Sequence, residues 1–187
     1  MISFEESNTA WCIDPGDSRP ILDWLADNHK VLCGILVTHA HFDHIYGIND
    51  LTNQFPEATI YVSEYGKECL QNAKLNGSLY HEMPFVVRHN KIEVVNENVS
   101  IEMSDNQVMQ VWETPGHSRD SLTFYIEEQV FTGDAFIPGI KTRTVFKGGD
   151  KEQAARSIQK ILSRINDSTV IYPGHKEICY KKECEIV

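Results

Sequence analysis

Three histidines and one aspartate are concentrated in one short segment of the chain. His39, His41, Asp43 and His44 form the string HAHFDH, which directly follows the apolar run Leu32 to Val37. Imidazole nitrogens and carboxylate oxygens are ligands that zinc accepts, and side chains at the tip of a buried strand can converge on an ion. The alternative is a histidine-rich surface loop without a metal. We interpret the segment as part of a metal site.

Three further segments each place a metal-competent side chain after a glycine. They are TPGH, TGD and YPGH, which end at His117, Asp134 and His175. Glycine lets the backbone bend or pass close to a neighbour, so the next side chain can be directed inward. Five of the eight histidines fall in these segments and in HAHFDH. A total of five imidazoles and two carboxylates suits a site for two metal ions.

The elements that must position these residues alternate between short β-rich runs and helix-like segments. This alternation is typical of an α/β or α+β protein. No repeat, low-complexity stretch or linker is evident, so we expect a single domain over residues 1–187. The expected strands are residues 11–13, 32–37, 59–62, 108–113, 122–126, 129–132 and 169–172. The expected helices begin near Asp17 and at Ile45, Ser63 and Asp150, and the second extends to Phe55.

The charge and the N-terminal sequence restrict the partners. The formal net charge is −10, and no segment is dense in Lys and Arg, so a nucleic-acid partner is not expected. The first residues do not resemble a signal peptide, and no apolar run is long enough to span a membrane. We therefore expect a cytoplasmic protein that acts on a small molecule, with no membrane partner. A homo-oligomer is expected if a sheet edge is left uncovered.

The five cysteines do not suggest a structural role for sulfur. They are scattered and contain no Cys-x-x-Cys pair, which predicts neither a disulfide framework nor a thiolate zinc site. Most are expected to be reduced and buried. Cys179 and Cys184, close to the C-terminus, are expected to be exposed and prone to oxidation.

The wording of these segments resembles a known family. HAHFDH, TPGHSRDSLTFYI, VFTGDAFIP and VIYPGH are similar to motifs of the metallo-β-lactamase superfamily, and most of all to its glyoxalase II-like (hydroxyacylglutathione hydrolase-like) branch. The resemblance extends from about Asp14 to His175. It implies an α+β fold, a four-layer αββα sandwich of two mixed sheets with helices on both outer faces.

The resemblance also implies a ligand set and a reaction. One zinc ion would be held by His39, His41 and His117, the second by Asp43, His44 and His175, and Asp134 would bridge the two. Zinc lowers the pKa of bound water from ~16 to ~7, so a metal-bound hydroxide would attack a small ester-like substrate. A thioester is favoured over a lactam or a phosphodiester. Asp43 would also orient the attacking oxygen, which makes it the catalytic candidate.

The chain departs from the branch at both ends. Relatives usually have two strands before the segment that contains Asp14, and about a dozen residues precede it here, so a trimmed first sheet is expected. Twelve residues follow His175, where glyoxalase II has a helical domain that contacts glutathione. A glutathione thioester is therefore not assumed.

Several residues outside the motifs are candidates for substrate contacts. Lys141, Arg143 and Lys147 form a local cationic group suited to a substrate carboxylate, and a solvated loop is the equally good alternative. Tyr46 is the main aromatic candidate for lining a pocket. The other aromatic candidates are Tyr80, Phe136 and Phe146. For His81 and His89, which lie outside every motif, a structural role is expected.

Two other functions remain open from the residues alone. A persulfide dioxygenase with a single iron would use His39, His117 and Asp134 in nearly the same motifs. A non-enzymatic protein, or one completed by a partner chain, would use the metal for folding. All seven ligand positions are filled, whereas a structural zinc needs only a closed set of four ligands.

Overall fold

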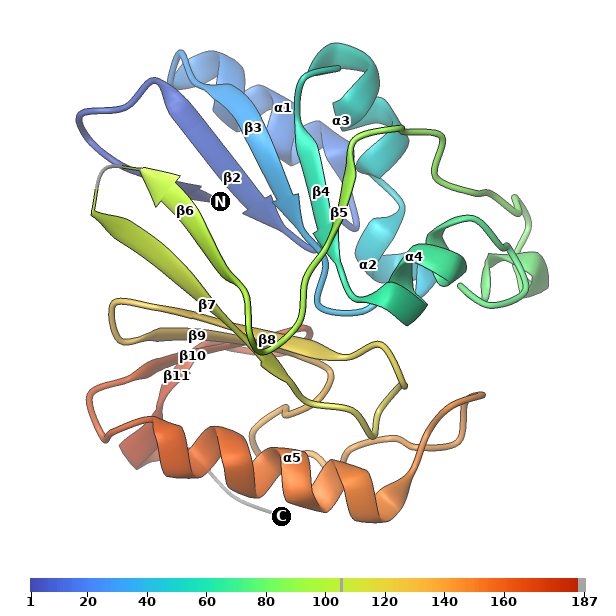
Figure 1. The fold of residues 1–187 in the computed structure, drawn as a ribbon, viewed down its shortest axis with the longest axis vertical. Helices are drawn as coiled ribbons and strands as arrows, with labels where there is room; N and C mark the ends of the chain where they lie inside the picture. Colours follow the sequence, from blue (N-terminus) through green and yellow to red (C-terminus); the bar gives the residue numbers. More distant parts are fainter. Residues whose placement is uncertain (105, 185–187) are drawn as a thin grey trace. The chain divides into compact units, whose positions relative to one another are not determined.

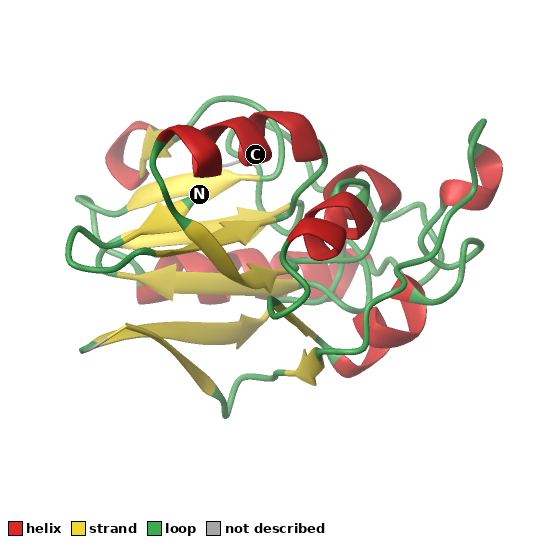
Figure 2. Cartoon of the chain, turned by 90° about the horizontal axis from the view of Figure 1, so that it is seen from above, coloured by secondary structure: helices red, strands yellow, loops and turns green. Residues whose placement is uncertain are grey.

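The computed structural model describes residues 1–104 and 106–184. The chain divides into two compact units, Met1–Val94 and Val95–Val187, which we call the N-terminal and C-terminal units. Each unit contains one sheet, and each sheet has both parallel and antiparallel strand pairs (Figures 1 and 2). The expectation of an α+β protein with two mixed sheets is therefore confirmed.

The N-terminal unit is built on a five-stranded sheet in the order β1-β2-β3-β4-β5. β1 pairs with β2 in the antiparallel direction, and the remaining pairs are parallel. The strands are β1 (Ile2–Ser3), β2 (Thr9–Ile13), β3 (Val31–Leu36), β4 (Thr59–Val62) and β5 (Ile92–Val94). The predicted strands in this unit are confirmed, with ends shifted by one or two residues.

The expectation of a trimmed first sheet is wrong. Two strands precede Asp14, because residues 2 and 3 pair with Trp11 and Ala10 of β2. A strand of two residues has no periodicity that a sequence can reveal, so only the tertiary pairing identifies β1.

The helices of the N-terminal unit pack on its sheet, and one of them begins within the HAHFDH segment. They are α1 (Ser18–Asp27), α2 (Phe42–Ile45), α3 (Ile48–Gln54), α4 (Glu64–Leu70) and the 3-10 turn η1 (Ser78–Tyr80). Leu25 of α1 and Leu51 of α3 belong to the same buried apolar cluster as Ile35 of β3 and Ile60 of β4. Each such side chain contributes about 1.5–3 kcal/mol when it is fully buried, so this core holds the helices on the sheet.

One predicted helix is divided in the structure. We expected a single helix from Ile45 to Phe55, and α2 and α3 instead occupy this region, with Gly47 between them. The Gly47 N–H donates to the carbonyl of Pro15 at 2.7 Å, and a Cβ on Gly47 would lie 2.8 Å from the same oxygen. This close approach to the loop after β2 interrupts the helix.

The C-terminal unit contains a six-stranded sheet in the order β11-β10-β9-β8-β7-β6. Only the β9–β10 pair is parallel. The strands are β6 (Ser100–Ser104), β7 (Gln107–Glu113), β8 (Leu122–Ile126), β9 (Gln129–Gly133), β10 (Val170–Pro173) and β11 (Cys179–Tyr180). The predicted hairpin is confirmed, and Glu127 and Glu128 at its turn have φ of 46° and 62°, as a type I′ turn requires.

The long helix in the described part of the C-terminal unit is α5 (Lys151–Arg164), and a 3-10 turn, η2 (Lys181–Glu183), follows β11. The predicted cap is confirmed, because the Asp150 carboxylate accepts from the Gln153 N–H at 2.8 Å. That hydrogen bond holds the pKa of Asp150 below its ordinary value. Ile161 of α5 packs with Val130 of β9 and Ile171 of β10 in the core.

The cysteines follow the prediction in part. Cys12 and Cys69 are buried thiols, and burial raises the pKa of the Cys12 thiol to about 12. The sequence predicted no disulfide framework, but Cys179 and Cys184, expected to be prone to oxidation, form a disulfide and are half-buried rather than exposed. β11 and η2 bring their Cα atoms to 6.4 Å, within the range that a disulfide spans.

Among the described residues, none of the helices has both the length and the apolar character needed to cross a membrane.

Candidate metal centre

The N-terminal unit carries four of the predicted ligands on one short stretch after β3. The Val37 N–H bonds the carbonyl of Tyr61, which continues the sheet pairing to the start of this stretch. The ring centroid of His39 lies 4.6 Å from that of His41 and 4.1 Å from that of His44. Three imidazoles are thus gathered within one unit, with Asp43 on the same turn.

Asp14 organises this cluster. It follows β2 with φ of 47°, and its carboxylate accepts from the Thr38 N–H at 2.7 Å and from the Thr38 hydroxyl at 2.5 Å. The same carboxylate lies 2.9 Å from Nδ1 of His44, and the Thr38 hydroxyl lies 3.1 Å from Nδ1 of His39. A carboxylate on one ring nitrogen orients a histidine so that Nε2 is the atom presented to a metal.

Sequence reasoning missed Asp14. Asp14 directly follows β2, and a carboxylate at the tip of a strand is a signal of the same kind as the predicted ligands. Donor atoms of Asp14, His39 and His44 all lie within 4.8 Å of one another. A residue that hydrogen-bonds both a ligand side chain and the loop carrying that ligand affects metal affinity without coordinating the ion.

Close backbone packing braces the same stretch. A Cβ on Gly16 would lie 2.2 Å from the carbonyl oxygen of Asp43, so only glycine fits there. The Phe42 N–H donates to the carbonyl of Asn76 at 2.8 Å. The turn that carries Asp43 and His44 is therefore held from two sides by other segments of its own unit.

The C-terminal unit carries the other three predicted ligands, each just after a different strand. His117 follows β7, Asp134 follows β9 and His175 follows β10. The two carboxylate oxygens of Asp134 lie 3.6 Å from Nε2 of His117 and 3.6 Å from Nε2 of His175. One carboxylate between two imidazoles is the arrangement expected of a residue that bridges two ions.

Glycine and the backbone hold His117 in place. Gly116 has φ of 138°, and a Cβ there would lie 2.2 Å from the backbone nitrogen of Ala154 at the start of α5. Nδ1 of His117 lies 2.8 Å from the carbonyl oxygen of Arg143. Because a carbonyl only accepts, Nδ1 is the protonated nitrogen, and Nε2 is the one available as a ligand atom.

Four hydroxyls lie close in sequence to the predicted ligands, those of Thr38, Thr114, Ser121 and Thr132. The Thr38 hydroxyl contacts a ligand imidazole, that of His39. The other three stabilise the strand ends instead. The Thr114 hydroxyl lies 2.9 Å from that of Thr123, and the Ser121 hydroxyl lies 2.8 Å from that of Ser118. The Thr132 hydroxyl donates to the carbonyl of Phe136 at 2.6 Å. Proximity in sequence was a poor guide, because residues before and after a sharp turn face different ways.

The cationic group lies on the exposed loop between Asp134 and α5. Lys141 and Arg143 are both exposed. The Arg143 guanidinium lies 5.4 Å from the ring centroid of Phe146, and that ring lies 6.2 Å from the His117 ring. Since the Arg143 carbonyl also bonds His117, this loop is adjacent to one predicted ligand.

The aromatic residues predicted to line a substrate pocket lie in different environments. Tyr46 lines a pocket in the N-terminal unit, whereas Tyr80 is 71% exposed and is not among the residues that line it. Phe136 is only 2% exposed and packs in the core of the C-terminal unit, so its predicted pocket role is wrong. The structural role predicted for His89 is confirmed, because its Nε2 lies 2.6 Å from the carbonyl oxygen of Ala58.

The donor chemistry of the two sets fits zinc or iron. The N-terminal set offers three imidazoles and a carboxylate, and the C-terminal set offers two imidazoles and a carboxylate. Nitrogen-rich sets favour these metals, whereas magnesium and calcium prefer sites made of oxygen atoms alone. The hydrogen bonds to Nδ1 of His39, His44 and His117 are of the kind that orient metal-binding imidazoles.

Comparisons with known proteins agree with this geometry. The chain is 31% identical to a hydroxyacylglutathione hydrolase of Hydrogenovibrio crunogenus, over 91% of this chain and 55% of that protein. It is 30% identical to the hydroxyacylglutathione hydrolase of Psychromonas ingrahamii, over 94% of this chain and 60% of that protein. The chain thus spans somewhat more than half the length of these curated relatives.

A solved structure with a similar fold is that of the BLEG-1 B3 metallo-beta-lactamase, with a TM-score of 0.87 and 28% identity. The match covers 95% of this chain and 86% of that one. The family model described as the metallo-beta-lactamase superfamily matches residues 12–175, a range that contains all seven predicted ligands. The chain therefore belongs to the metallo-beta-lactamase superfamily.

Proposed function

We propose that this chain is a metal-dependent hydrolase that cleaves a small ester-like substrate, specifically a thioester. The observation that carries the proposal is the Asp134 carboxylate, which lies 3.6 Å from the imidazoles of both His117 and His175. The similarity to hydroxyacylglutathione hydrolases supports a thioester as the substrate class.

Two zinc ions are proposed, because the donor set is large enough for both. The first would be held by His39, His41 and His117, the second by Asp43, His44 and His175, and Asp134 would be shared. Support comes from the nitrogen-rich donor chemistry and from the hydrogen bonds that orient three of the rings.

Bound zinc lowers the pKa of water and polarises a carbonyl group, which is the chemistry that thioester hydrolysis needs. The chain's own residues would orient the reactants. Asp43 would hold the attacking oxygen, while Asp14 and Thr38 keep the imidazoles of His44 and His39 in a fixed orientation. Water adds to the carbonyl carbon, the carbon–sulfur bond breaks, and a carboxylic acid and a thiol leave.

We assign Lys141 and Arg143 to the recognition of a substrate carboxylate. Both cations are exposed on the loop whose Arg143 carbonyl bonds His117, so their position is tied to a proposed ligand. In a chain with a net charge of −10, a local cationic group attracts an anion that the rest of the surface repels. Tyr46 is proposed as an aromatic contact.

The decisive experiment combines metal content with turnover. Protein purified without added metal is analysed for its elements, and hydrolysis of a thioester is measured before and after chelation. About two zinc ions per chain with chelator-sensitive cleavage support the proposal. One iron per chain, no cleavage, and oxygen consumption with glutathione persulfide would replace it with a dioxygenase that uses His39, His117 and Asp134.

Two further substrate outcomes are informative. Because a solved structure with a similar fold is that of a B3 metallo-beta-lactamase, a chromogenic cephalosporin belongs in the same panel. Faster turnover of the lactam than of every thioester would overturn the substrate class but not the metal site. Full metal occupancy with no turnover of any ester, thioester, lactam or persulfide would indicate a non-enzymatic or partner-completed protein.

A cytoplasmic location and a homo-oligomer complete the proposal. The location is tested by cell fractionation together with the redox state of the Cys179–Cys184 pair, because disulfides rarely persist in a reducing compartment. The oligomeric state is tested by analytical ultracentrifugation.

A further inference from the structure

We propose that a pocket beside α2 binds the apolar acyl group of the substrate and sets the acyl selectivity of the enzyme. The inference rests on the proposed thioester hydrolysis. The α2 pocket lies within the N-terminal unit and has a volume of about 390 Å³, within the range of small-ligand sites. Three aromatic side chains, Phe42, Tyr46 and Phe85, form much of its wall.

The wall of the α2 pocket is continuous with the turn that carries the proposed ligands. Phe42 lies between His41 and Asp43 in the chain, and Tyr46 follows one helical turn later. Residues four apart share a helix face, so both rings project to the same side. The Tyr46 ring meets the Phe85 ring at 5.2 Å, edge to face. A group that binds against Phe42 therefore contacts the residue that directly precedes Asp43 in the chain.

The floor of the pocket is fixed by hydrogen bonds. The Ser78 hydroxyl lies 3.0 Å from both the N–H and the carbonyl oxygen of Phe85. The Asn76 side chain donates to the same carbonyl at 3.1 Å, and the Asn76 carbonyl accepts from the Phe42 N–H at 2.8 Å. Because Asn76 and Ser78 are buried, these bonds preform the site before a ligand arrives.

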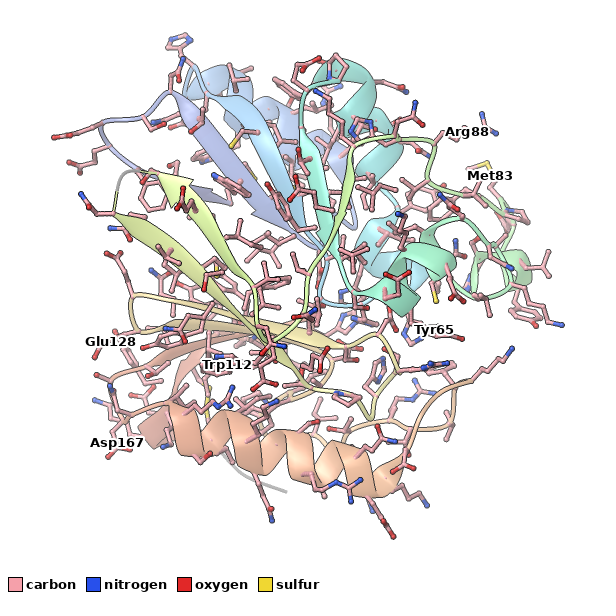
Figure 3. All side chains as sticks on the ribbon, viewed as in Figure 1. Tyr65, Met83, Arg88, Trp112, Glu128 and Asp167 are labelled. Atoms are coloured by element: carbon pink, nitrogen blue, oxygen red, sulfur yellow. A yellow bond between two sulfur atoms is a disulfide. The ribbon has the colours of Figure 1, made fainter. Side chains whose placement is uncertain are left out.

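The rim of the pocket is apolar and accessible. Met83 is 67% exposed and Tyr46 is 46% exposed. Figure 3 shows Met83 on the loop between α4 and β5, at the outer side of its unit. Methionine is flexible and packs well against aromatic rings, which suits a surface that closes over a bound group. Exposed apolar side chains grouped around a hollow are typical of binding sites.

The charges of the lining favour an apolar occupant. Among the described residues that line the pocket, none is Lys or Arg, and Glu82 contributes a carboxylate. The His81 ring packs against Phe42, with centroids 3.8 Å apart and the rings tilted by 33°, and so adds to the aromatic wall. A carboxylate on the substrate would be repelled here, whereas Lys141 and Arg143 suit it. We therefore assign this pocket to the uncharged acyl part, of branched or aromatic type.

The test uses thioesters of one thiol with acetyl, butyryl, hexanoyl and phenylacetyl groups. Met83→Asp places a charge at the exposed rim without disturbing the core, and Met83→Leu restores an apolar rim. Leu79→Ala, on η1 but outside the lining, is the matched control. The metal-loaded wild type should favour phenylacetyl over acetyl in kcat/KM by about tenfold or more, as apolar pockets do. Met83→Asp should remove this preference, and the other two variants should keep it.

A second measurement does not require turnover. Phenylacetamide, an uncharged analogue of the acyl group, is titrated into the metal-loaded protein while the NMR signals of the Met83 methyl group and the Tyr46 and Phe85 rings are followed. Saturable shifts that weaken about tenfold in Met83→Asp but not in Leu79→Ala support the inference. Equal binding in all variants, or no shift at these residues, overturns it.

The two measurements separate the inference from the function on which it rests. If the wild type cleaves thioesters and Met83→Asp keeps the same acyl preference, the pocket assignment is wrong and the hydrolase proposal stands. If no thioester is cleaved, the proposed function and the acyl assignment both fail, and the titration then decides only whether the pocket binds uncharged aromatic groups.

Discussion

The two sets of proposed ligands are built in different ways. In the N-terminal unit, His39, His41, Asp43 and His44 belong to one continuous turn that Asp14 braces at its base. In the C-terminal unit, three ligands come from three strand ends that are far apart in the sequence.

The difference shows what each set depends on. The C-terminal set requires the register of its sheet: Gly133 pairs with Pro173 at an irregularity between Tyr172 and Pro173, and the Gly174 N–H bonds the Gly133 carbonyl at 2.9 Å. The N-terminal set requires mainly local backbone geometry and one carboxylate. Substitutions of the residues that position the ligands should therefore act through folding in the C-terminal unit and through metal affinity in the N-terminal unit.

The largest effect is expected from Asp134→Ala, which removes the carboxylate that lies between two imidazoles. Metal-ion catalysis contributes several kcal/mol, so thioesterase activity should fall by roughly 10³-fold or more, with metal content reduced. Steady-state kinetics and elemental analysis measure both. Asp167→Ala, at an exposed loop position visible in Figure 3, is the control. Retention of both ions and full activity would exclude Asp134 as a ligand.

Asp14→Asn tests the brace of the N-terminal set. Asparagine tolerates the positive φ of this position but carries no charge for His44, so metal affinity should fall by about 10–100-fold while folding is retained. Competition with a chromophoric chelator measures the affinity, and circular dichroism checks the fold. Asp27→Asn, at the exposed end of α1, should leave the affinity unchanged. If Asp14→Asn binds metal with the wild-type affinity, the turn keeps its geometry without the Asp14 carboxylate.

Gly116→Ala tests how far the C-terminal set depends on packing. The new Cβ would lie 2.2 Å from the Ala154 nitrogen at an unfavourable φ of 138°, so unfolding free energy should fall by about 3 kcal/mol or more. Gly77→Ala is the matched control, because its φ is 82° but its Cβ meets nothing closer than 3.7 Å. It should lose only about 1–2 kcal/mol. Chemical denaturation that ranks them the other way would contradict this account.

The Cys179–Cys184 disulfide is a further feature of the C-terminal unit that can be tested. It closes a short loop just after the strand that leads to His175. Cys179→Ser should lower stability by about 2 kcal/mol, as expected for a small closed loop. Urea denaturation with and without reductant measures the effect, and mass spectrometry under non-reducing conditions checks the pairing. If the wild type is insensitive to reductant, the disulfide does not contribute to stability.

The smallest effect is expected from Glu97→Gln, which disrupts ion pairs with α5. Partial burial acts to raise the pKa of Glu97, but hydrogen bonds from Lys160 and Arg164 outweigh it and hold that pKa below its ordinary value. The ion pairs therefore stabilise the fold above the pKa of the unfolded carboxyl, and this contribution is lost as pH falls through the folded value.

The substitution should cost about 0.5–1 kcal/mol at neutral pH and less in acid. Thermal unfolding of the wild type and Glu97→Gln, followed from neutral to acidic pH, measures the difference in stability. A cost that grows as the pH falls would contradict the assignment.

The sequence by itself was sufficient to predict the β8–β9 hairpin and the cap of α5 at Asp150, and to propose seven ligand positions. Each depends on short patterns: alternation of apolar residues, a glycine before a ligand, or a carboxylate before a helix. Such patterns are local, so they can be recognised in the sequence without a structure. The family resemblance extended them to an α+β fold with two mixed sheets.

Only the tertiary structure revealed the role of Asp14, the Cys179–Cys184 disulfide, strand β1 and the α2 pocket. Each requires segments that are distant in sequence, or that turn sharply, to meet in space. Asp14 contacts His44 across 30 residues, and Phe85 reaches Tyr46 across a loop with no periodic pattern. Composition and spacing describe neighbours along the chain, whereas these contacts depend on which buried surfaces pack together.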